Sequence, residues 1–96
     1  MPNLSEIISK IKKAKPSLAE RYKVSKIGVF GSYVKNQQTP ESDVDIIVEF
    51  SEPIGLDFVK LANELEEILD EKVDLVSRKA IKPKYLRYVE KELHYV

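Results

Sequence analysis

The feature that most constrains this chain is a Gly-Ser pair followed, ten residues later, by an Asp-x-Asp pair. Gly31-Ser32 ends one apolar segment, residues 33–42 follow, and Asp43 and Asp45 begin the next apolar segment. A glycine at the end of a strand permits a turn or a close backbone approach that a side chain would block, and backbone amides at such a turn can hold phosphate. The spacing therefore predicts a phosphate-binding turn that faces a pair of carboxylates.

Three aspartates lie within or at the start of apolar strands, where this residue type is disfavoured. Residues i and i+2 of a strand share a face, so Asp43 and Asp45 point the same way, and Asp74 joins them if its strand pairs beside theirs. Two carboxylates about 6.5 Å apart repel by roughly 2.5 kcal/mol at an effective dielectric of about 20. A divalent cation removes that repulsion, and ligands that offer only oxygen suit Mg²⁺ or Mn²⁺ rather than Zn²⁺.

The turn itself offers further groups to an anion. Residues 33–36 are expected to form a short helical turn capped by Ser32. The first amides of such a turn have no partner within it and can point at a bound phosphate. Lys35, one turn along, could reach the same phosphate. A purely structural explanation stays open for the turn and for the aspartates, each taken alone. The turn could be an ordinary strand-turn-helix corner. Asp43 could be a loop or cap residue, Asp45 could face solvent, and Asp74 could pair with a nearby lysine. The fixed spacing between the two parts is what favours a functional site.

The rest of the chain predicts an α+β fold, a small mixed sheet with helices packed on it in two layers. We expect helices over residues 4–14, 56–70 and 83–91 and strands over 27–30, 44–50, 73–76 and 94–96. Pro16 is expected to end the first helix or to begin a second short one that continues to Tyr22. No internal repeat or linker interrupts the pattern, so residues 1–96 are expected to form a single domain.

Composition restricts the partners and the compartment. Sixteen Lys and Arg residues balance sixteen Asp and Glu residues, so the formal net charge is zero and nucleic acid is an unlikely partner. The absence of cysteine excludes disulfides and thiolate metal sites. No apolar run approaches about 18 residues, and the charges near the N-terminus are atypical of a signal peptide. We therefore expect a cytoplasmic protein without a membrane span, in which any nucleotide site is local.

The segment GSYVKNQQTPESDVD, which continues into IIVEF, resembles the signature of the minimal nucleotidyltransferases of the DNA polymerase beta superfamily. The resemblance extends over nearly the whole chain, including KIGVFGS and the KVDLVS segment that carries the third aspartate. It is strongest to the small stand-alone members found as antitoxins beside HEPN-domain toxins. One departure is Asn36, where many relatives carry glycine; asparagine tolerates a left-handed backbone better than most residues.

The resemblance implies a role for each motif residue. Asp43 and Asp45 would hold the metals, Asp74 would complete the site and help activate the attacking hydroxyl, and Gly31 and Ser32 would bind the triphosphate. Two Mg²⁺ ions, or Mn²⁺, would serve as cofactors and ATP as substrate. The implied reaction moves AMP to a hydroxyl, by expectation a tyrosine, of a HEPN-domain toxin in a type VII-like toxin-antitoxin pair.

Two other functions stay open. The chain could be a non-catalytic antitoxin that neutralises its partner by forming a complex, or a transferase subunit whose small-molecule acceptor is held by a second subunit. For every one of these functions, a homo- or hetero-oligomer stays open. A basic stretch follows Asp74 and could meet phosphate or an acidic partner, although a solvated face is the simpler interpretation. Its members are Arg78, Lys79, Lys82, Lys84 and Arg87.

Overall fold

A four-stranded mixed sheet forms the centre of the computed structural model, which describes residues 2–96. The described elements, in chain order, are α1 (Leu4–Tyr22), β1 (Val24–Phe30), the 3-10 turn η1 (Gly31–Tyr33), β2 (Val44–Phe50), α2 (Asp57–Leu69), β3 (Val73–Ser77), the 3-10 turn η2 (Arg78–Ala80), α3 (Pro83–Glu92) and β4 (His94–Tyr95). The strand order is β3-β2-β1-β4. β1 is antiparallel to β2 and β4, whereas β2 and β3 are parallel. The sheet thus places the strand of Asp74 beside the strand of Asp45, which is the condition under which the sequence puts the three aspartates together.

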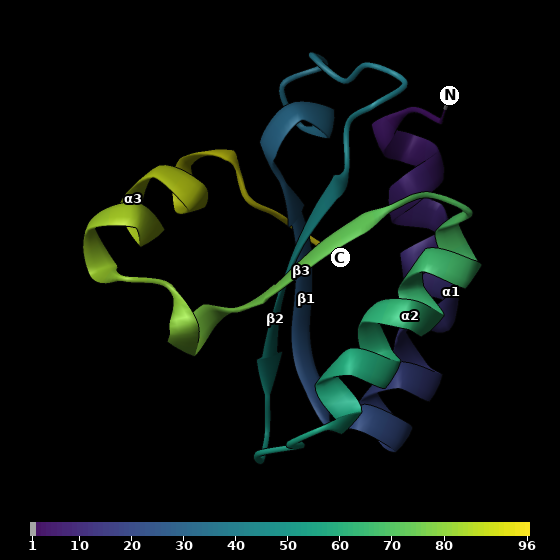
Figure 1. Cartoon of the computed structure of the whole chain (residues 1–96), viewed down its shortest axis with the longest axis vertical. Helices are drawn as coiled ribbons and strands as arrows, with labels where there is room; N and C mark the ends of the chain where they lie inside the picture. Colours follow the sequence, from purple (N-terminus) through teal and green to yellow (C-terminus); the bar gives the residue numbers. More distant parts are fainter. Residues whose placement is uncertain (1) are drawn as a thin grey trace.

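The helices lie on both faces of this sheet. α1 and α2 pack side by side on one face, and α3 lies on the other (Figure 1). The apolar core fills the space between the sheet and the helix pair; β2 contributes Val44, Ile46 and Val48 to it. The alternate residues of β2, among them Asp45 and Glu49, therefore face the side of α3. The α+β class is confirmed, and α3 is the helix that lies on the side of the second face (Figure 1).

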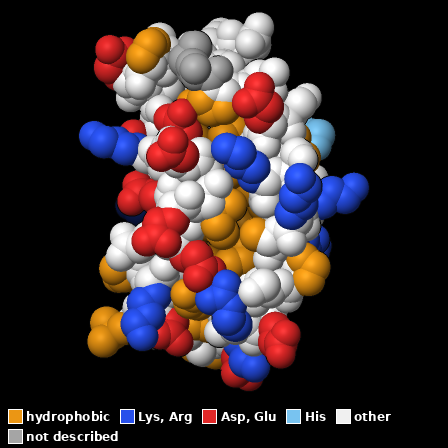
Figure 2. All heavy atoms as spheres, turned by 90° about the vertical axis from the view of Figure 1, so that its right-hand side faces the viewer, with side chains coloured by type: hydrophobic (Ala, Val, Ile, Leu, Met, Phe, Trp, Pro, Cys, Tyr) orange, Lys and Arg blue, Asp and Glu red, His pale blue; other side chains and the backbone are white. Residues whose placement is uncertain are grey.

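The face formed by α1 and α2 is divided by charge. Figure 2 looks onto this face and shows acidic side chains mostly on the left and basic ones mostly on the right of an apolar strip. Arg21 of α1 donates two hydrogen bonds to the carboxylate of Glu64 on α2, at 2.8 and 2.5 Å. Opposite charge thus adds to apolar packing in holding the two helices together.

The expected end of the first helix at Pro16 is wrong, because α1 continues without a break from Leu4 to Tyr22. Proline lacks the amide that would bond to the carbonyl of Lys12, but both positions are exposed, so water can satisfy that carbonyl. Leu18 and Tyr22 lie beyond the proline and are buried in the core. Burial of these two side chains outweighs the missing hydrogen bond. Asn3 caps the helix, since its Oδ1 accepts from the Glu6 amide at 2.9 Å.

The other predicted elements occur near their expected positions. α2, α3 and β4 lie within the ranges expected for them or differ by one residue at an end, whereas β1 begins three residues earlier than predicted, at Val24. The early start reflects pairing with β2, since Val24 lies opposite Phe50 at the far end of that strand. Among residues 2–96, no helix combines the length and the apolar character that a bilayer span needs.

Candidate active site

The three aspartates lie near one another on the side of the sheet toward α3 (Figure 1). Asp45 of β2 and Asp74 of β3 are register partners in the parallel pair, so their side chains leave the sheet next to each other. Asp43 precedes β2 by one residue and has the same parity as Asp45. Asp43 and Asp74 are exposed, whereas Asp45 is half-buried. Tertiary structure therefore unites two aspartates that are 29 residues apart in the chain.

Among residues 2–96, no cation compensates the charge of this group in a described ion pair. None of the ion pairs described for residues 2–96 includes Asp43, Asp45 or Asp74. Burial, together with the neighbouring carboxylates of Asp74, Asp43 and Glu92, raises the pKa of Asp45 from 3.8 to about 6. The purely structural explanation, in which Asp74 pairs with a lysine, is not what the structure contains. A buried carboxylate beside other carboxylates is typical of a site that receives a cation.

Gly31 lies directly against the carboxylate of Asp45. Its φ is +78°, and a Cβ at this position would overlap Oδ2 of Asp45. The register explains the contact, since Phe30, the last residue of β1, lies opposite Asp45. The close approach predicted from the glycine is confirmed, and the Gly-Ser turn and the acidic group form one continuous site.

The helical turn expected over 33–36 begins earlier, at Gly31. The amides of Val34 and Lys35 both donate to the Gly31 carbonyl, at 3.1 and 3.2 Å. The expectation that Ser32 caps this turn is therefore wrong: Ser32 lies inside it. The reason is the left-handed conformation of Gly31, which turns the chain immediately after β1, while the buried ring of Tyr33 anchors the turn to the core. Asn36 has a φ of +57°, as its tolerance of the left-handed region predicts.

Lys35 is engaged by an acid from a distant element. Its Nζ lies 2.9 Å from Oε1 of Glu92, at the end of α3. The same carboxylate contributes to the raised pKa of Asp45, so Glu92 borders both the lysine and the acidic group. Sequence reasoning missed Glu92, because it lies 57 residues after Lys35 and no local pattern connects the two. Glu92, on α3, therefore pairs with Lys35 and also adds negative charge beside the acidic group.

The acidic group suits a hard cation by the chemistry of its donors. Carboxylate oxygens without nitrogen or sulfur are the ligands of Mg²⁺ and Mn²⁺. Among residues 2–96, no three His, Cys, Asp or Glu side chains already lie close enough to hold one ion together. Asp43 and Asp74 are exposed and so have room to reorient toward Asp45. The residues therefore fit divalent cations whose last contacts form on binding.

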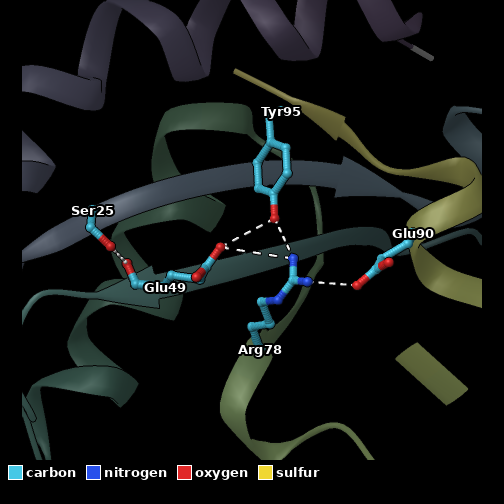
Figure 3. Close-up of polar contacts among 5 residues, drawn as sticks. All are labelled: Ser25, Glu49, Arg78, Glu90 and Tyr95. Atoms are coloured by element: carbon cyan, nitrogen blue, oxygen red, sulfur yellow. Dashed lines mark hydrogen bonds and ion pairs between the residues drawn. The ribbon is translucent and has the colours of Figure 1, made fainter. Parts of the chain in front are cut away.

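A second charged group lies at the other end of the same sheet face and is fully paired (Figure 3). Arg78 of η2 donates to Oε1 of Glu90 at 2.5 Å and to the hydroxyl of Tyr95 at 2.6 Å, and it lies 3.9 Å from Glu49. The Tyr95 hydroxyl in turn donates to Oε2 of Glu49 at 3.1 Å. We call these four residues the Arg78 cluster. The cluster links β2, η2, α3 and β4, so it ties the C-terminal segment to the sheet.

Gly28 makes room for that segment. A Cβ at Gly28 would lie 2.7 Å from Cδ1 of Leu93 and 3.1 Å from the carbonyl oxygen of His94. The register pairs Gly28 with Tyr95, so β4 lies close against β1 at this point.

Beyond the Arg78 cluster, a cavity of about 420 Å³ lies between the end of β2, η2 and Leu86 of α3. Its lining includes paired Arg78 and no aspartate of the acidic group, so it is separate from the candidate active site.

Comparison with known proteins agrees with this arrangement. The sequence profile of the family described as "Nucleotidyltransferase domain" matches residues 11–96. The protein adenylyltransferase MntA of Thermococcus cleftensis is 43% identical over 97 residues, which cover 100% of this chain and 98% of MntA. The similarity therefore extends over the whole length of both proteins.

Solved structures share the fold. One, described as a "putative minimal nucleotidyltransferase", superposes with a TM-score of 0.81 at 30% sequence identity and covers 97% of this chain and 95% of its own. A crystal structure of a toxin-antitoxin pair with AMP-PNP superposes with a TM-score of 0.70 at 27% identity; the match covers 98% of this chain and 72% of that chain. The arrangement of sheet and helices is thus that of a minimal nucleotidyltransferase.

Proposed function

This chain is a minimal nucleotidyltransferase, a member of the nucleotidyltransferase-domain family, and from that premise we propose that it transfers AMP from ATP to a hydroxyl of a partner protein. The observation that carries the proposal is the half-buried Asp45, which lies against Gly31 and beside Asp74 with no described cation partner. The MntA relative is named a protein adenylyltransferase, which supports a protein as the acceptor.

Each site residue has a role in this proposal. The backbone of Gly31 and the hydroxyl of Ser32 hold the terminal phosphates at the start of η1, where the first amides have no partner within the turn. Asp43, Asp45 and Asp74 would hold Mg²⁺, which supplies charge neutralisation at the phosphates and stabilises the attacking and leaving oxygens when bound. Lys35 would contribute a positive charge to the same phosphates, in place of its ion pair with Glu92.

The chemical step is an in-line displacement. The acceptor hydroxyl forms a bond to the α-phosphorus while the bond from that phosphorus to the bridging oxygen of the β-phosphate breaks, and pyrophosphate leaves. Asp74 would accept the hydroxyl proton; its exposure on the outer strand β3 supports this role. Asp45 is the less accessible carboxylate, which suits a ligand role better than taking a proton from the hydroxyl of a bulky acceptor.

We further propose that the acceptor is a tyrosine of a HEPN-domain toxin and that the chain acts as its antitoxin. Support comes from the similarity to a toxin-antitoxin structure that holds AMP-PNP and from the protein adenylyltransferase relative.

The test follows label from α-labelled ATP in the presence of Mg²⁺, with and without the HEPN-domain protein as acceptor. Label should move to the acceptor with the wild-type chain and not with an Asp43→Ala/Asp45→Ala variant. A Glu20→Ala/Glu67→Ala variant is the matched control, since it removes two exposed carboxylates outside the site. Equal transfer by the Asp variant would refute the proposal. A stable complex without transfer, formed equally well by all three proteins, would instead identify a binding antitoxin.

A further inference from the structure

Helix α3 separates its charges between two sides. Both of its acids face the body of the protein and are paired: Glu90 with Arg78 at 2.5 Å and Glu92 with Lys35 at 2.9 Å. Its cations take part in none of the ion pairs described for residues 2–96. These cations are Lys84, Arg87 and Lys91. The helix therefore presents positive charge outward, although the charges of the whole chain balance.

Two exposed tyrosines lie among these cations. Tyr85 is 54% exposed and Tyr88 is 67% exposed. The ammonium of Lys84 lies 5.3 Å from the ring centre of Tyr85, and that of Lys91 lies 5.7 Å from the ring centre of Tyr88. Together with Arg87 these residues line a shallow groove of about 530 Å³. We call the five residues the α3 basic face.

We propose that the α3 basic face is the docking surface for an acidic segment of the acceptor protein. Tyrosine and arginine are the residue types enriched at the energetic centres of protein interfaces. Outward cations without acids between them would attract carboxylates and steer an acidic partner toward this side of the molecule. The inference rests on the proposed function in one respect, that the acceptor is a protein.

The dimensions of the face favour a protein segment over a nucleic acid. Lys84 and Lys91 are seven residues apart, which is about 10.5 Å along a helix. A protein that binds DNA through its phosphates makes about 6–10 phosphate contacts. This groove carries three cations, which is too few for that number of contacts. A short acidic segment can match that number.

The face is connected to the active site by its own helix. Glu92 follows Tyr88 by one helical turn, about 6 Å along the axis, and Glu92 pairs with Lys35, which follows the Gly-Ser turn. A partner seated along α3 would therefore lie on the same side of the sheet as the acidic group, where the acceptor hydroxyl is needed (Figure 1). Docking on the opposite face, formed by α1 and α2, would place the sheet between partner and aspartates.

The experiment uses a random copolymer of glutamate and tyrosine as an acidic probe and measures its binding to the full chain by fluorescence anisotropy. The test variant is Lys84→Glu/Arg87→Glu/Lys91→Glu. The matched control is Lys10→Glu/Lys12→Glu/Lys13→Glu on α1, which changes the net charge by the same amount at exposed lysines that have no described ion pair. A milder variant, Lys84→Ala/Arg87→Ala/Lys91→Ala, guards against misfolding, which circular dichroism monitors in each protein.

The α3 variant should weaken binding at least about tenfold, and the α1 control less than about twofold. Equal weakening in both, no binding by the wild-type chain, or tighter binding of single-stranded RNA of the same length would overturn the proposal. Transfer of label to the HEPN-domain protein is measured in parallel. If the probe binds through α3 but no label moves, the docking surface stands and the proposed function fails.

Discussion

Two groups of acids share one face of the sheet and differ in what surrounds them. Asp45 and Asp74 lie at the start of β2 and β3 without a described cation partner, whereas Glu49, at the far end of β2, is joined to Arg78 and Tyr95. Asp45 and Glu49 are four residues apart on the same strand face. Residue type alone therefore does not distinguish a structural carboxylate from a functional one. The charges that surround each carboxylate distinguish the two kinds.

The largest effect on the transfer rate is expected from comparing two single variants, one that removes an acid without a described partner and one that removes a paired acid. Asp45→Ala is expected to lower the rate of AMP transfer at least about 10³-fold, because lost charge stabilisation at a metal-assisted displacement is worth several kcal/mol. Glu49→Ala, which removes a paired acid from the same strand, should change the rate by less than about threefold. Initial rates of label transfer at saturating ATP measure both. Similar losses in the two variants would erase the proposed distinction.

The second prediction compares the two glycines that border these groups. Gly31→Ala should lower the free energy of unfolding by about 2–4 kcal/mol, because it adds left-handed strain to an overlap with Asp45. Gly28→Ala should cost about 1–2 kcal/mol, since its closest contact is the flexible end of Leu93. Urea unfolding gives both values. A larger loss at Gly28 would mean that the turn at Gly31 adapts more easily than β4 does.

The third prediction removes the arginine that compensates the charge of Glu49. Arg78→Ala should destabilise the protein by about 1–2 kcal/mol, because Glu49, Glu90 and the Tyr95 hydroxyl lose their shared donor. Arg78→Lys should recover part of the loss, and Arg87→Ala, whose guanidinium has no described ion pair, should leave stability unchanged. Thermal unfolding distinguishes the three proteins. No change in the Arg78→Ala variant would contradict a structural role for the Arg78 cluster.

The smallest expected effect tests the charge of Asp45 itself. Its folded-state pKa of about 6 lies above the ordinary value of 3.8, so between those pH values the folded protein binds more protons than the unfolded chain. Stability should therefore fall as pH rises through this window. Asp45→Asn removes the charge and should stabilise the metal-free protein at pH 7 by about 1 kcal/mol after allowance for solvent screening.

The same variant provides its own control in pH and in metal. The gain in melting temperature from Asp45→Asn should disappear near pH 4, where the wild-type carboxyl is itself protonated in the folded protein. Millimolar Mg²⁺ should raise the melting temperature of the wild-type protein and not that of the variant. A variant that is less stable than the wild type at pH 7 would show that the carboxylate already has a partner.

Much of the fold follows from local pattern. The alternation of apolar and polar residues in 44–50 places Asp45 and Glu49 away from the core, because successive side chains of a strand point to opposite faces. The helical spacing of apolar residues gives α2 almost to the residue. The failure at Pro16 shows the limit of local rules, since burial of Leu18 and Tyr22 overrides the preference of proline to end a helix.

The Gly-Ser turn, its distance from Asp43 and Asp45, and the sheet face of those carboxylates can be predicted from the sequence, because they depend on backbone geometry over a few residues. Long-range packing is needed to align Asp74 with Asp45, to pair Glu92 with Lys35, and to bring Arg78 to Glu49 while no cation described in the structure reaches Asp45. The physical reason is that charge compensation acts over a few ångströms in space between groups far apart in the chain.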